Sequence, residues 1–367
     1  MGGGAFPSTQ RLSEEEYARK CGEIKQVLDT AGISFGFPVE IEDKAELCKE
    51  RGKDKPYGDV DVIIAVDDRQ KRIEIVHLVK NVIGLEGGEV RKNDTIYSFL
   101  STERFQIDLM FCELENLEFL LAFESNNDFG ALLGHLLTRL KLKWSELGLV
   151  LKLEIEEVSG VGTCKADVVL TRDVSVVCSF LGLPGHSLDG KTRLSTREVF
   201  EVLTKSKVFF ACDYDEKYKI RERRKRRPLI DAFFNILESN QEDLDKIKGK
   251  LYENDEVEKL FRNFKMKTID YEEYIKLISE HFNKGDEVME RLKVLKTKSK
   301  PNPKFNFQVL CSWCPGVEQN MVGRIMGKVK SKHKGTGNNG FEDWINETEV
   351  EDIKLEVENI RDGLMKM

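Results

Sequence analysis

The sequence predicts an α/β domain with a mixed sheet, followed by a mainly helical carboxy-terminal half. A β-branched apolar stretch at 60–66 and a second apolar stretch at 105–112 are each interrupted by one aspartate, and a helical pattern over 71–83 lies between them. Beyond about residue 195, apolar residues recur at helical spacing. A chain of 367 residues has room for two or three domains at roughly 150 residues each.

The remaining elements of the amino-terminal half follow from local patterns. Apolar residues at helical spacing after Ser13 predict a capped helix over 12–30. The polar stretch 43–57 is typical of a loop that follows a short helix. We expect further elements in this order: a hairpin over 88–99 turning at Lys92-Asn93-Asp94, a helix over 128–143, and strands over 148–156 and 167–171.

The second half is predicted to be helical as far as a linker. The expected helices span 196–206, 217–238, 241–264, 270–283 and 285–296. A Pro/Lys-rich stretch at 297–304 indicates a linker, and the last 60 residues are typical of two or three short helices.

Composition excludes several classes of protein. No apolar run approaches the roughly 18–20 residues of a membrane span, and the amino-terminus has no basic and apolar secretory signal. Eight scattered cysteines fit free thiols in a reducing compartment. We therefore expect an intracellular protein with no membrane partner.

Charge is unevenly distributed along the chain, although the net charge is only −7. Residues 217–227 contain eight basic residues and one acidic residue, whereas 341–360 contain eight acidic residues and one basic residue. An acidic protein can therefore still present a basic patch.

The basic run predicts contacts to nucleic-acid phosphates. The candidate residues are Arg221, Arg223, Arg224 and Arg227. Two alternatives remain open at this point: a solvated helix, or a nuclear-import signal, since RERRKRRP at 221–228 has that composition. The second alternative makes a nuclear location more favoured than a cytoplasmic one.

Three aspartates form the most informative pattern. Asp59 and Asp61 lie two residues apart on one predicted strand and so share a face, and Asp108 interrupts the second apolar strand. An aspartate within an apolar strand is costly unless it is paired or binds a cation. Three of them on adjacent strands would make an oxygen site for Mg²⁺, and two such ions about 3.5–4 Å apart serve phosphoryl or nucleotidyl transfer. The alternative is that each aspartate only caps a turn at a strand end.

The pattern Gly58-Asp59-Val60-Asp61, with Asp108 about fifty residues later, resembles the nucleotidyltransferase superfamily of DNA polymerase beta (family X). The resemblance implies a palm domain in which Asp59 and Asp61 bind two Mg²⁺ ions, or Mn²⁺. It also implies that Asp108 binds the catalytic metal and activates a primer 3′-hydroxyl. The implied reaction joins a (d)NTP to the 3′ end of DNA or RNA and releases pyrophosphate.

Two later stretches extend this resemblance to about residues 12–210. The segment K-W-S-E-L-G-L at 143–149 is similar to the Ser/Asn-Glu-Tyr/His-Gly-Leu turn of that family. Leu181-Gly182-Leu183-Pro184 and the segment 196–203 are similar to its thumb-end pattern. Together with the helical pattern and the linker, it leads us to expect a palm at 1–122, a thumb-like region at 123–210, a helical region with the basic helix at 211–300, and a small helical accessory domain at 301–367.

The chain departs from the family where the triphosphate would be held. The family's Gly-Ser, about ten residues before the first aspartate, is replaced by Leu47-Cys48-Lys49-Glu50-Arg51-Gly52-Lys53. By charge, Lys49, Arg51 and Lys53 are candidate triphosphate contacts, and the backbone at Gly58 is expected to approach the phosphates; the alternative is a solvated basic loop. The departure favours a further reading, a catalytically degenerate palm that binds nucleic acid or a protein.

A second departure replaces the family's Thr-Gly-Ser segment with Glu124-Ser125-Asn126. Asn126, Asn127 and Asp128 there are candidate contacts to base or sugar, although a helix N-cap cluster is favoured.

The carboxy-terminal region adds two motifs. Cys311 and Cys314 form a lone CxxC without a second ligand pair, so two half-buried thiols on a helix are favoured over a metal or redox site. The stretch 315–330, which begins Pro315-Gly316, resembles an element of tRNA nucleotidyltransferases whose accessory domain holds the RNA. It supports a rival function, template-independent RNA or tRNA nucleotidyl transfer.

Overall fold

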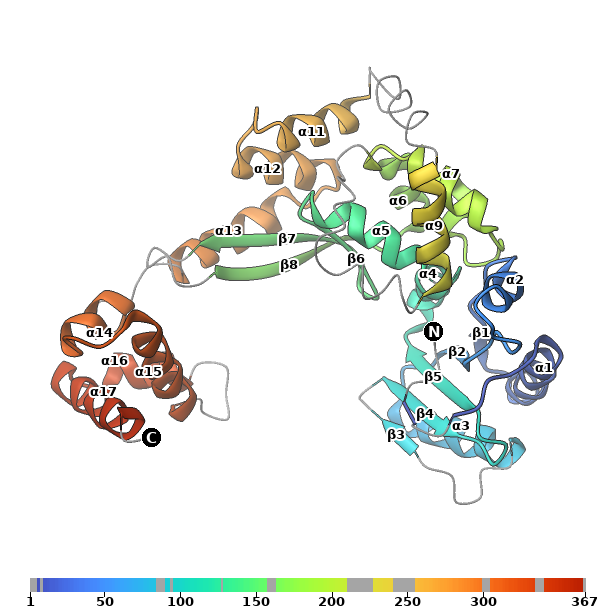
Figure 1. Ribbon diagram of the computed structural model, residues 1–367, viewed down its shortest axis with the longest axis horizontal. Helices are drawn as coiled ribbons and strands as arrows, with labels where there is room; N and C mark the ends of the chain where they lie inside the picture. The colour runs from blue at the N-terminus through green and yellow to red at the C-terminus, as the bar shows by residue number, and fades with distance from the viewer. Residues whose placement is uncertain are drawn as a thin grey trace. The chain divides into compact units, whose positions relative to one another are not determined.

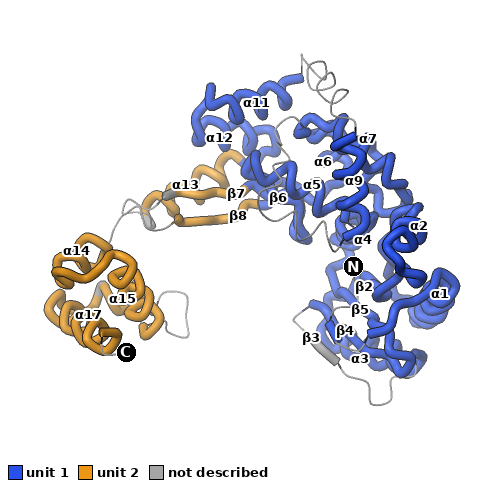
Figure 2. Tube along the Cα trace, in the orientation of Figure 1, with its two compact units in different colours: residues 1–151, 169–284 blue, residues 152–168, 285–367 orange. Residues whose placement is uncertain are grey.

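The computed structural model contains two compact units, coloured separately in Figure 2. Unit 1 comprises residues 1–151 and 169–284, and unit 2 comprises 152–168 and 285–367. The structure describes residues 5–6, 9–83, 90–92, 95–126, 128–156, 163–209, 227–239, 255–298, 304–333 and 340–365. The chain is mixed α/β in its amino-terminal part and helical in its carboxy-terminal half, which agrees with the predicted class.

A five-stranded mixed sheet forms the amino-terminal part of unit 1 (Figure 1). The strand order is β1-β2-β5-β4-β3, in which β2 and β5 are parallel and the other three pairs are antiparallel. The strands are β1 (Ser34–Gly36), β2 (Asp59–Ala65), β3 (Val90–Lys92), β4 (Ile96–Leu100) and β5 (Gln106–Cys112). The predicted mixed sheet is confirmed, and so is the β3–β4 hairpin, whose turn at Asn93-Asp94 lies outside the described residues.

Alternation over the first residues of the two central strands separates an apolar face from a face that carries acidic side chains. Val60 and Val62 of β2 and Ile107 and Leu109 of β5 are fully buried. They share one core with apolar residues of α1 (Glu14–Thr30) and α3 (Arg69–Val82), which also pack on each other. Because successive side chains of a strand point to opposite faces, Asp59, Asp61 and Asp108 lie on the face away from this core.

Helix α1 begins as its sequence predicts. The Ser13 hydroxyl accepts from the Glu16 backbone N–H, and the Glu16 carboxylate accepts from the Ser13 N–H, which completes a capping box. Ile24 and Leu28 are buried on its inner face. The cap fixes where the chain enters the sheet region and so stabilises the helix that covers the apolar face.

The rest of unit 1 contains helices and part of a second, three-stranded sheet, of which residues 152–156 and 163–168 belong to unit 2. The sheet has the order β6-β7-β8. Its strands are β6 (Leu142–Ser145), β7 (Gly148–Glu156) and β8 (Thr163–Thr171). The helices are α2 (Lys44–Lys49), α4 (Leu117–Glu124), α5 (Phe129–Thr138), α6 (Val174–Leu181), α7 (Thr196–Thr204), α9 (Pro228–Ser239), α11 (Glu256–Lys265) and α12 (Tyr271–His281), with short 3₁₀ turns η1 (Leu114–Asn116) and η2 (Gly185–Leu188).

Several predicted elements of unit 1 were wrong in extent. Among the described residues, the helices expected over 217–238 and 241–264 begin only at Pro228 and Glu256, because Arg227 and Asp255 before them are not helical. The helix expected over 128–143 ends at Thr138, and residues 142–145 form β6. The stretch 43–57, expected as a loop, contains α2, whose buried side chains are only Leu47 and Cys48. The segment K-W-S-E-L-G-L does make a turn, because Ser145 pairs with Gly148 across the β6–β7 hairpin.

Unit 2 contains a helical bundle with its own core. The helices assigned there are α13 (Gly285–Lys298), α14 (Phe307–Trp313), α15 (Gln319–Lys332), α16 (Gly340–Glu347) and α17 (Val350–Met365). Leu310, Val322, Ile325 and Ile353 are among the residues of that core. Within the described residues the last 60 positions thus hold four helices rather than the two or three expected.

The described residues give no support for a CxxC metal site. Cys311 is half-buried in α14 and Cys314 is buried at its carboxy-terminal end, both as free thiols. Across the part of the chain that the structure describes, no helix has the length and apolar character needed to span a membrane.

Candidate metal centre

Three carboxylates meet on the polar face of the five-stranded sheet. Asp59 and Asp61 extend from β2, and Asp108 extends from its parallel neighbour β5, where it pairs in register with Asp61. One carboxylate oxygen from each of the three lies within 4.8 Å of the other two. Among the described residues this is the one group of three or more possible metal ligands that meets that distance. The structure therefore brings together the three aspartates that the sequence singled out.

Mutual repulsion and burial make the fully ionised triad costly. Burial raises the pKa of Asp61 well above its ordinary value, and the nearby charges of Asp59 and Asp108 raise it further. Burial also raises the pKa of Asp108, although hydrogen bonds from Ser98 and Gln106 oppose that rise. Carboxylate oxygens are the ligands that Mg²⁺ prefers, so the donor set fits a divalent metal ion that would neutralise these charges.

Two polar side chains orient Asp108, and sequence reasoning missed both. The buried Gln106 donates its amide to both carboxylate oxygens of Asp108, at 2.9 and 2.8 Å. Ser98 lies directly opposite Asp108 on β4 and hydrogen-bonds to it. The signal for Gln106 was available, because it precedes Asp108 by two residues and so shares its face. Ser98 required the β4–β5 register.

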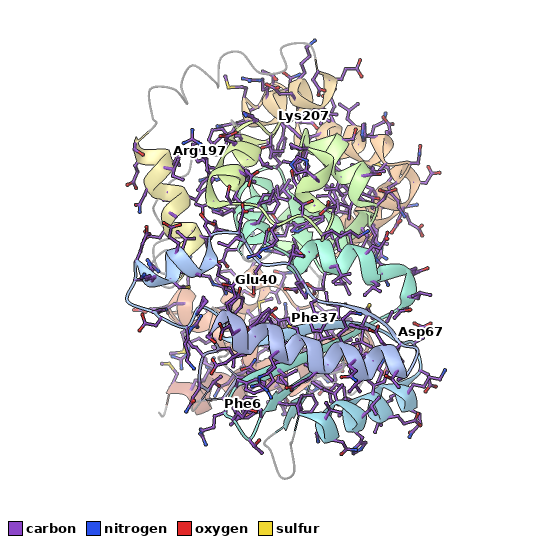
Figure 3. All side chains as sticks on the ribbon, turned by 90° about the vertical axis from the view of Figure 1, so that its right-hand side faces the viewer. Phe6, Phe37, Glu40, Asp67, Arg197 and Lys207 are labelled. Carbon is purple, nitrogen blue, oxygen red and sulfur yellow. The ribbon has the colours of Figure 1, made fainter. Side chains whose placement is uncertain are left out.

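A cavity of about 200 Å³ lies beside the triad within unit 1. Its charged lining contains five carboxylates and three cations: Glu40, Asp59, Asp61, Glu124 and Asp128, with Arg11, Lys44 and Arg227. Figure 3 shows Glu40 between α1 and the helices of the upper part of the unit. The cavity is thus an acidic site with a minority of positive groups.

Each of the three cations in the cavity is held by oxygen atoms. The Lys44 ammonium lies 2.5 Å from a carboxylate oxygen of Glu40. Arg11 donates from Nε to the carbonyl of Lys55 at 2.6 Å and from Nη2 to the carbonyl of Pro56. Arg227 donates from Nη1 to the carboxylate of Asp128. Because carbonyls carry no net charge, the charge of Arg11 is not cancelled by these bonds.

The residues predicted to hold the triphosphate separate into two groups. Gly58 lines the cavity, as expected for close backbone approach. Lys49, Arg51 and Lys53 are not part of its lining. Lys49 is exposed, and Arg51 forms an ion pair with Asp231 of α9 at 2.8 Å. Partial burial lowers the pKa of Lys53, and the neighbouring charge of Arg11 lowers it further.

Only one of the four predicted nucleic-acid contacts falls on the described part of the chain. Arg221, Arg223 and Arg224 lie outside the described residues, as does most of the candidate nuclear-import run. Arg227 is described, and its guanidinium lies at the cavity, one residue before α9 begins at Pro228.

Asn126 has a structural role in this molecule. Its side chain is buried, donates to the Thr192 carbonyl at 3.1 Å and accepts from the Leu194 N–H at 2.9 Å. These bonds join the turn before α5 to the segment before α7. Of the predicted N-cap cluster, Asp128 is the N-cap residue of α5, and Asn126 precedes it in the turn, while Asn127 lies outside the described residues.

Comparisons with families and with curated proteins found no relative of this chain. No model of a known protein family matches the chain. No curated protein matches it either. The functional argument therefore depends on the residues of the site itself.

Proposed function

We propose that this protein is a metal-dependent nucleotidyltransferase of the DNA polymerase beta type, which joins a (d)NTP to a nucleic-acid 3′-hydroxyl and releases pyrophosphate. One observation carries the proposal: Asp59, Asp61 and Asp108 meet on two parallel, in-register strands, on the face opposite the helix-covered core. A structural role alone does not account for three neighbouring carboxylates whose ionisation is disfavoured by burial and mutual repulsion.

In this proposal each aspartate has a distinct place. Asp59 and Asp61 would hold two Mg²⁺ ions, with Mn²⁺ as a substitute, and Asp108 would complete the site of one ion beside the 3′-hydroxyl. Bound ions of this kind lower the pKa of an attacking hydroxyl and neutralise charge on the transferred phosphate. Gln106 and Ser98 would keep the Asp108 carboxylate in a fixed orientation while the 3′-hydroxyl approaches.

A template-independent RNA or tRNA nucleotidyltransferase is the second candidate function. The observation that favours it is the helical bundle of unit 2, because the element at 315–330 there includes most of α15 and contributes Val322, Ile325 and Val329 to a separate core. A compact helical unit that folds around this element is suited to holding an RNA acceptor without a template.

A degenerate palm is the third possibility, and α2 supports it. The helix occupies the place of the family's Gly-Ser, and its N-cap residue Asp43 directs a carboxylate to the backbone N–H of Thr196 at 3.1 Å. A carboxylate at that position does not favour a triphosphate. If catalysis occurs, other groups must bind the phosphates.

The decisive experiment is a primer-extension assay with and without template, using each NTP and dNTP in the presence of Mg²⁺ or Mn²⁺. Asp61→Asn and Asp108→Asn should each lower extension about 100-fold or more, because each removes charge that stabilises the reacting centre. Asp67→Asn is the matched control, since Asp67 is exposed just beyond the other end of β2.

The outcomes separate the three candidates. Extension that requires a template supports the polymerase. Extension without a template supports the RNA or tRNA nucleotidyltransferase instead. If the folded wild-type protein extends no acceptor under any condition, nucleotidyl transfer is refuted and the degenerate palm remains.

A further inference from the structure

The cavity contains a charged contact that the aspartate triad does not explain. This contact is the ion pair of Arg227 with Asp128. Arg227 immediately precedes Pro228, the first residue of α9, and Asp128 is the N-cap residue of α5. The Asp128 side chain is 5% exposed, whereas the Arg227 side chain is 43% exposed. Both residues line the cavity beside Asp59 and Asp61. One partner is therefore fixed within the protein, and the other has access to solvent.

Helix α9 is anchored independently of this contact. Leu229, Ile230 and Phe233 are buried, and Asp231 forms the ion pair with Arg51. The backbone at Arg227 is consequently held in place by the packing of the residues that follow it. Its guanidinium can exchange one oxygen partner for another by side-chain rotation, without displacement of the helix.

The cavity as described does not suit a polyanion. Its volume of about 200 Å³ is below the roughly 300–1,000 Å³ of small-molecule sites. Carboxylates outnumber cations in its lining, and the Lys44 charge is opposed by Glu40. Arg11 keeps its charge, but two backbone carbonyls hold its guanidinium. A triphosphate beside the triad therefore gains a further positive contact only from a cation that can leave its carboxylate partner. Arg227 has the exposure and the position to do so.

We propose that Arg227 binds the triphosphate of the incoming nucleotide and that Asp128 competes with the phosphate for this guanidinium when no nucleotide is bound. This inference rests on the proposed nucleotidyl transfer and assigns its phosphate contact. A guanidinium presents paired N–H donors that match two phosphate oxygens, so the more highly charged phosphate displaces the single carboxylate. In this proposal Arg227 binds the phosphates of the nucleotide. The basic run around it had instead predicted a contact to nucleic-acid phosphates.

Competition of this kind predicts opposite effects for the two partners. Arg227→Ala removes a charged contact to the phosphates and should weaken polyphosphate binding about 10- to 100-fold. Asp128→Asn removes the competitor but keeps the shape of the side chain, and should tighten binding about 2- to 5-fold, the range of a partly exposed ion pair. Arg227→Lys should fall between the wild type and Arg227→Ala.

The test is isothermal titration calorimetry of the full chain with inorganic tripolyphosphate and with ATP and dATP, each in the presence of Mg²⁺. The matched control is Arg197→Ala, because Arg197 is 85% exposed on α7 and pairs with Glu201 at 3.3 Å. Figure 3 shows Arg197 away from the level of Glu40. Circular dichroism and thermal melting establish that each variant is folded.

The expected result is weaker binding by Arg227→Ala, tighter binding by Asp128→Asn and no change for Arg197→Ala. The proposal is overturned if the wild type does not bind tripolyphosphate, if Arg227→Ala binds as the wild type does, or if folded Asp128→Asn loses binding as Arg227→Ala does. The readout does not require catalysis. A chain that binds as expected but extends no primer refutes only the transferase, and an active chain with unchanged Arg227→Ala binding refutes only this inference.

Discussion

Replacement of Asp61 by asparagine should separate two contributions of the triad to the free energy of unfolding. One is the destabilising repulsion between its carboxylates, and the other is the stabilisation gained when it binds a metal ion. One carboxylate oxygen from each aspartate of the triad lies within 4.8 Å of the other two. At an effective dielectric constant of about 20, two unit charges at that distance repel by about 3.5 kcal/mol. Because burial and this repulsion already raise the pKa of Asp61, proton uptake relieves part of that energy. We therefore expect metal-free Asp61→Asn to be more stable than the metal-free wild type by about 1–3 kcal/mol.

Divalent metal should reverse this order. A metal ion at one hundred times its dissociation constant adds about 2.7 kcal/mol to the free energy of unfolding. For a domain of this size, each kcal/mol raises the melting temperature by about 2–4 °C. The wild type should therefore gain about 5–10 °C between EDTA and saturating Mn²⁺, whereas Asp61→Asn should gain much less.

The assay is thermal unfolding followed by circular dichroism at pH 7.5, in EDTA and in increasing MgCl₂ or MnCl₂, with Ca²⁺ as a second hard cation. Asp67→Asn controls for loss of one negative charge and should respond to metal as the wild type does. If Asp61→Asn and the wild type gain the same melting temperature, the metal binds elsewhere and the reasoning from the triad fails.

Two further predictions concern single hydrogen-bonding groups. Gln106→Ala removes both amide hydrogen bonds to Asp108 and should weaken Mn²⁺ affinity about 10- to 100-fold, measured by calorimetry; unchanged affinity would show that Gln106 does not orient a ligand. The backbone N–H of Ser13 is the main cause that lowers the pKa of Glu16 to about 2, and a hydrogen bond from Lys55 is the second cause. Its folded pKa lies below the ordinary value of 4.5, so the stabilisation is present above pH 4.5 and lost as the pH falls toward 2. Glu16→Gln should therefore cost about 1 kcal/mol at pH 7 and progressively less in urea unfolding below pH 4.5; a difference from the wild type that is independent of pH would contradict this assignment.

The central strands and the triad were predictable because their signals are local and periodic. Val60 and Val62 alternate with Asp59 and Asp61, and a half-buried strand requires that period. Only the register of β2 with β5 was beyond the sequence. That register depends on which apolar residues meet α1 and α3, which is a property of the assembled core.

The missed boundary at α5 shows why other elements were not predictable. Leu133, Leu136, Leu137 and Leu140 recur at helical spacing and are all buried, so the pattern alone continues the helix. The chain instead turns at Lys141, whose φ of +54° is in the left-handed region. A lysine seldom adopts that conformation, and nothing in its identity signals it. Tertiary packing therefore overrides the local pattern at this turn.

The pairing of Arg227 with Asp128 was unpredictable for a different reason. The two residues are 99 positions apart. The basic residues around Arg227 predicted a contact to nucleic acid instead of an ion pair within the protein. A charge pair of this kind follows from the docking of α9 on α2 and α7, which depends on long-range contacts.

The alternation of β2 explains why the candidate site and the core depend on each other. A slip of one residue in the pairing of β2 with β5 would turn Asp59 and Asp61 into the apolar core and Val60 and Val62 into the cavity. The apolar face therefore fixes the register that brings Asp61 beside Asp108. The same register concentrates negative charge, which only a proton or a cation relieves. Asp128 adds to that charge but is paired with Arg227. In the proposed function the acidic cavity thus has two separate requirements for positive charge, a metal ion at the triad and a guanidinium beside Asp128. A substrate that brings a metal-bound polyphosphate meets both requirements at once.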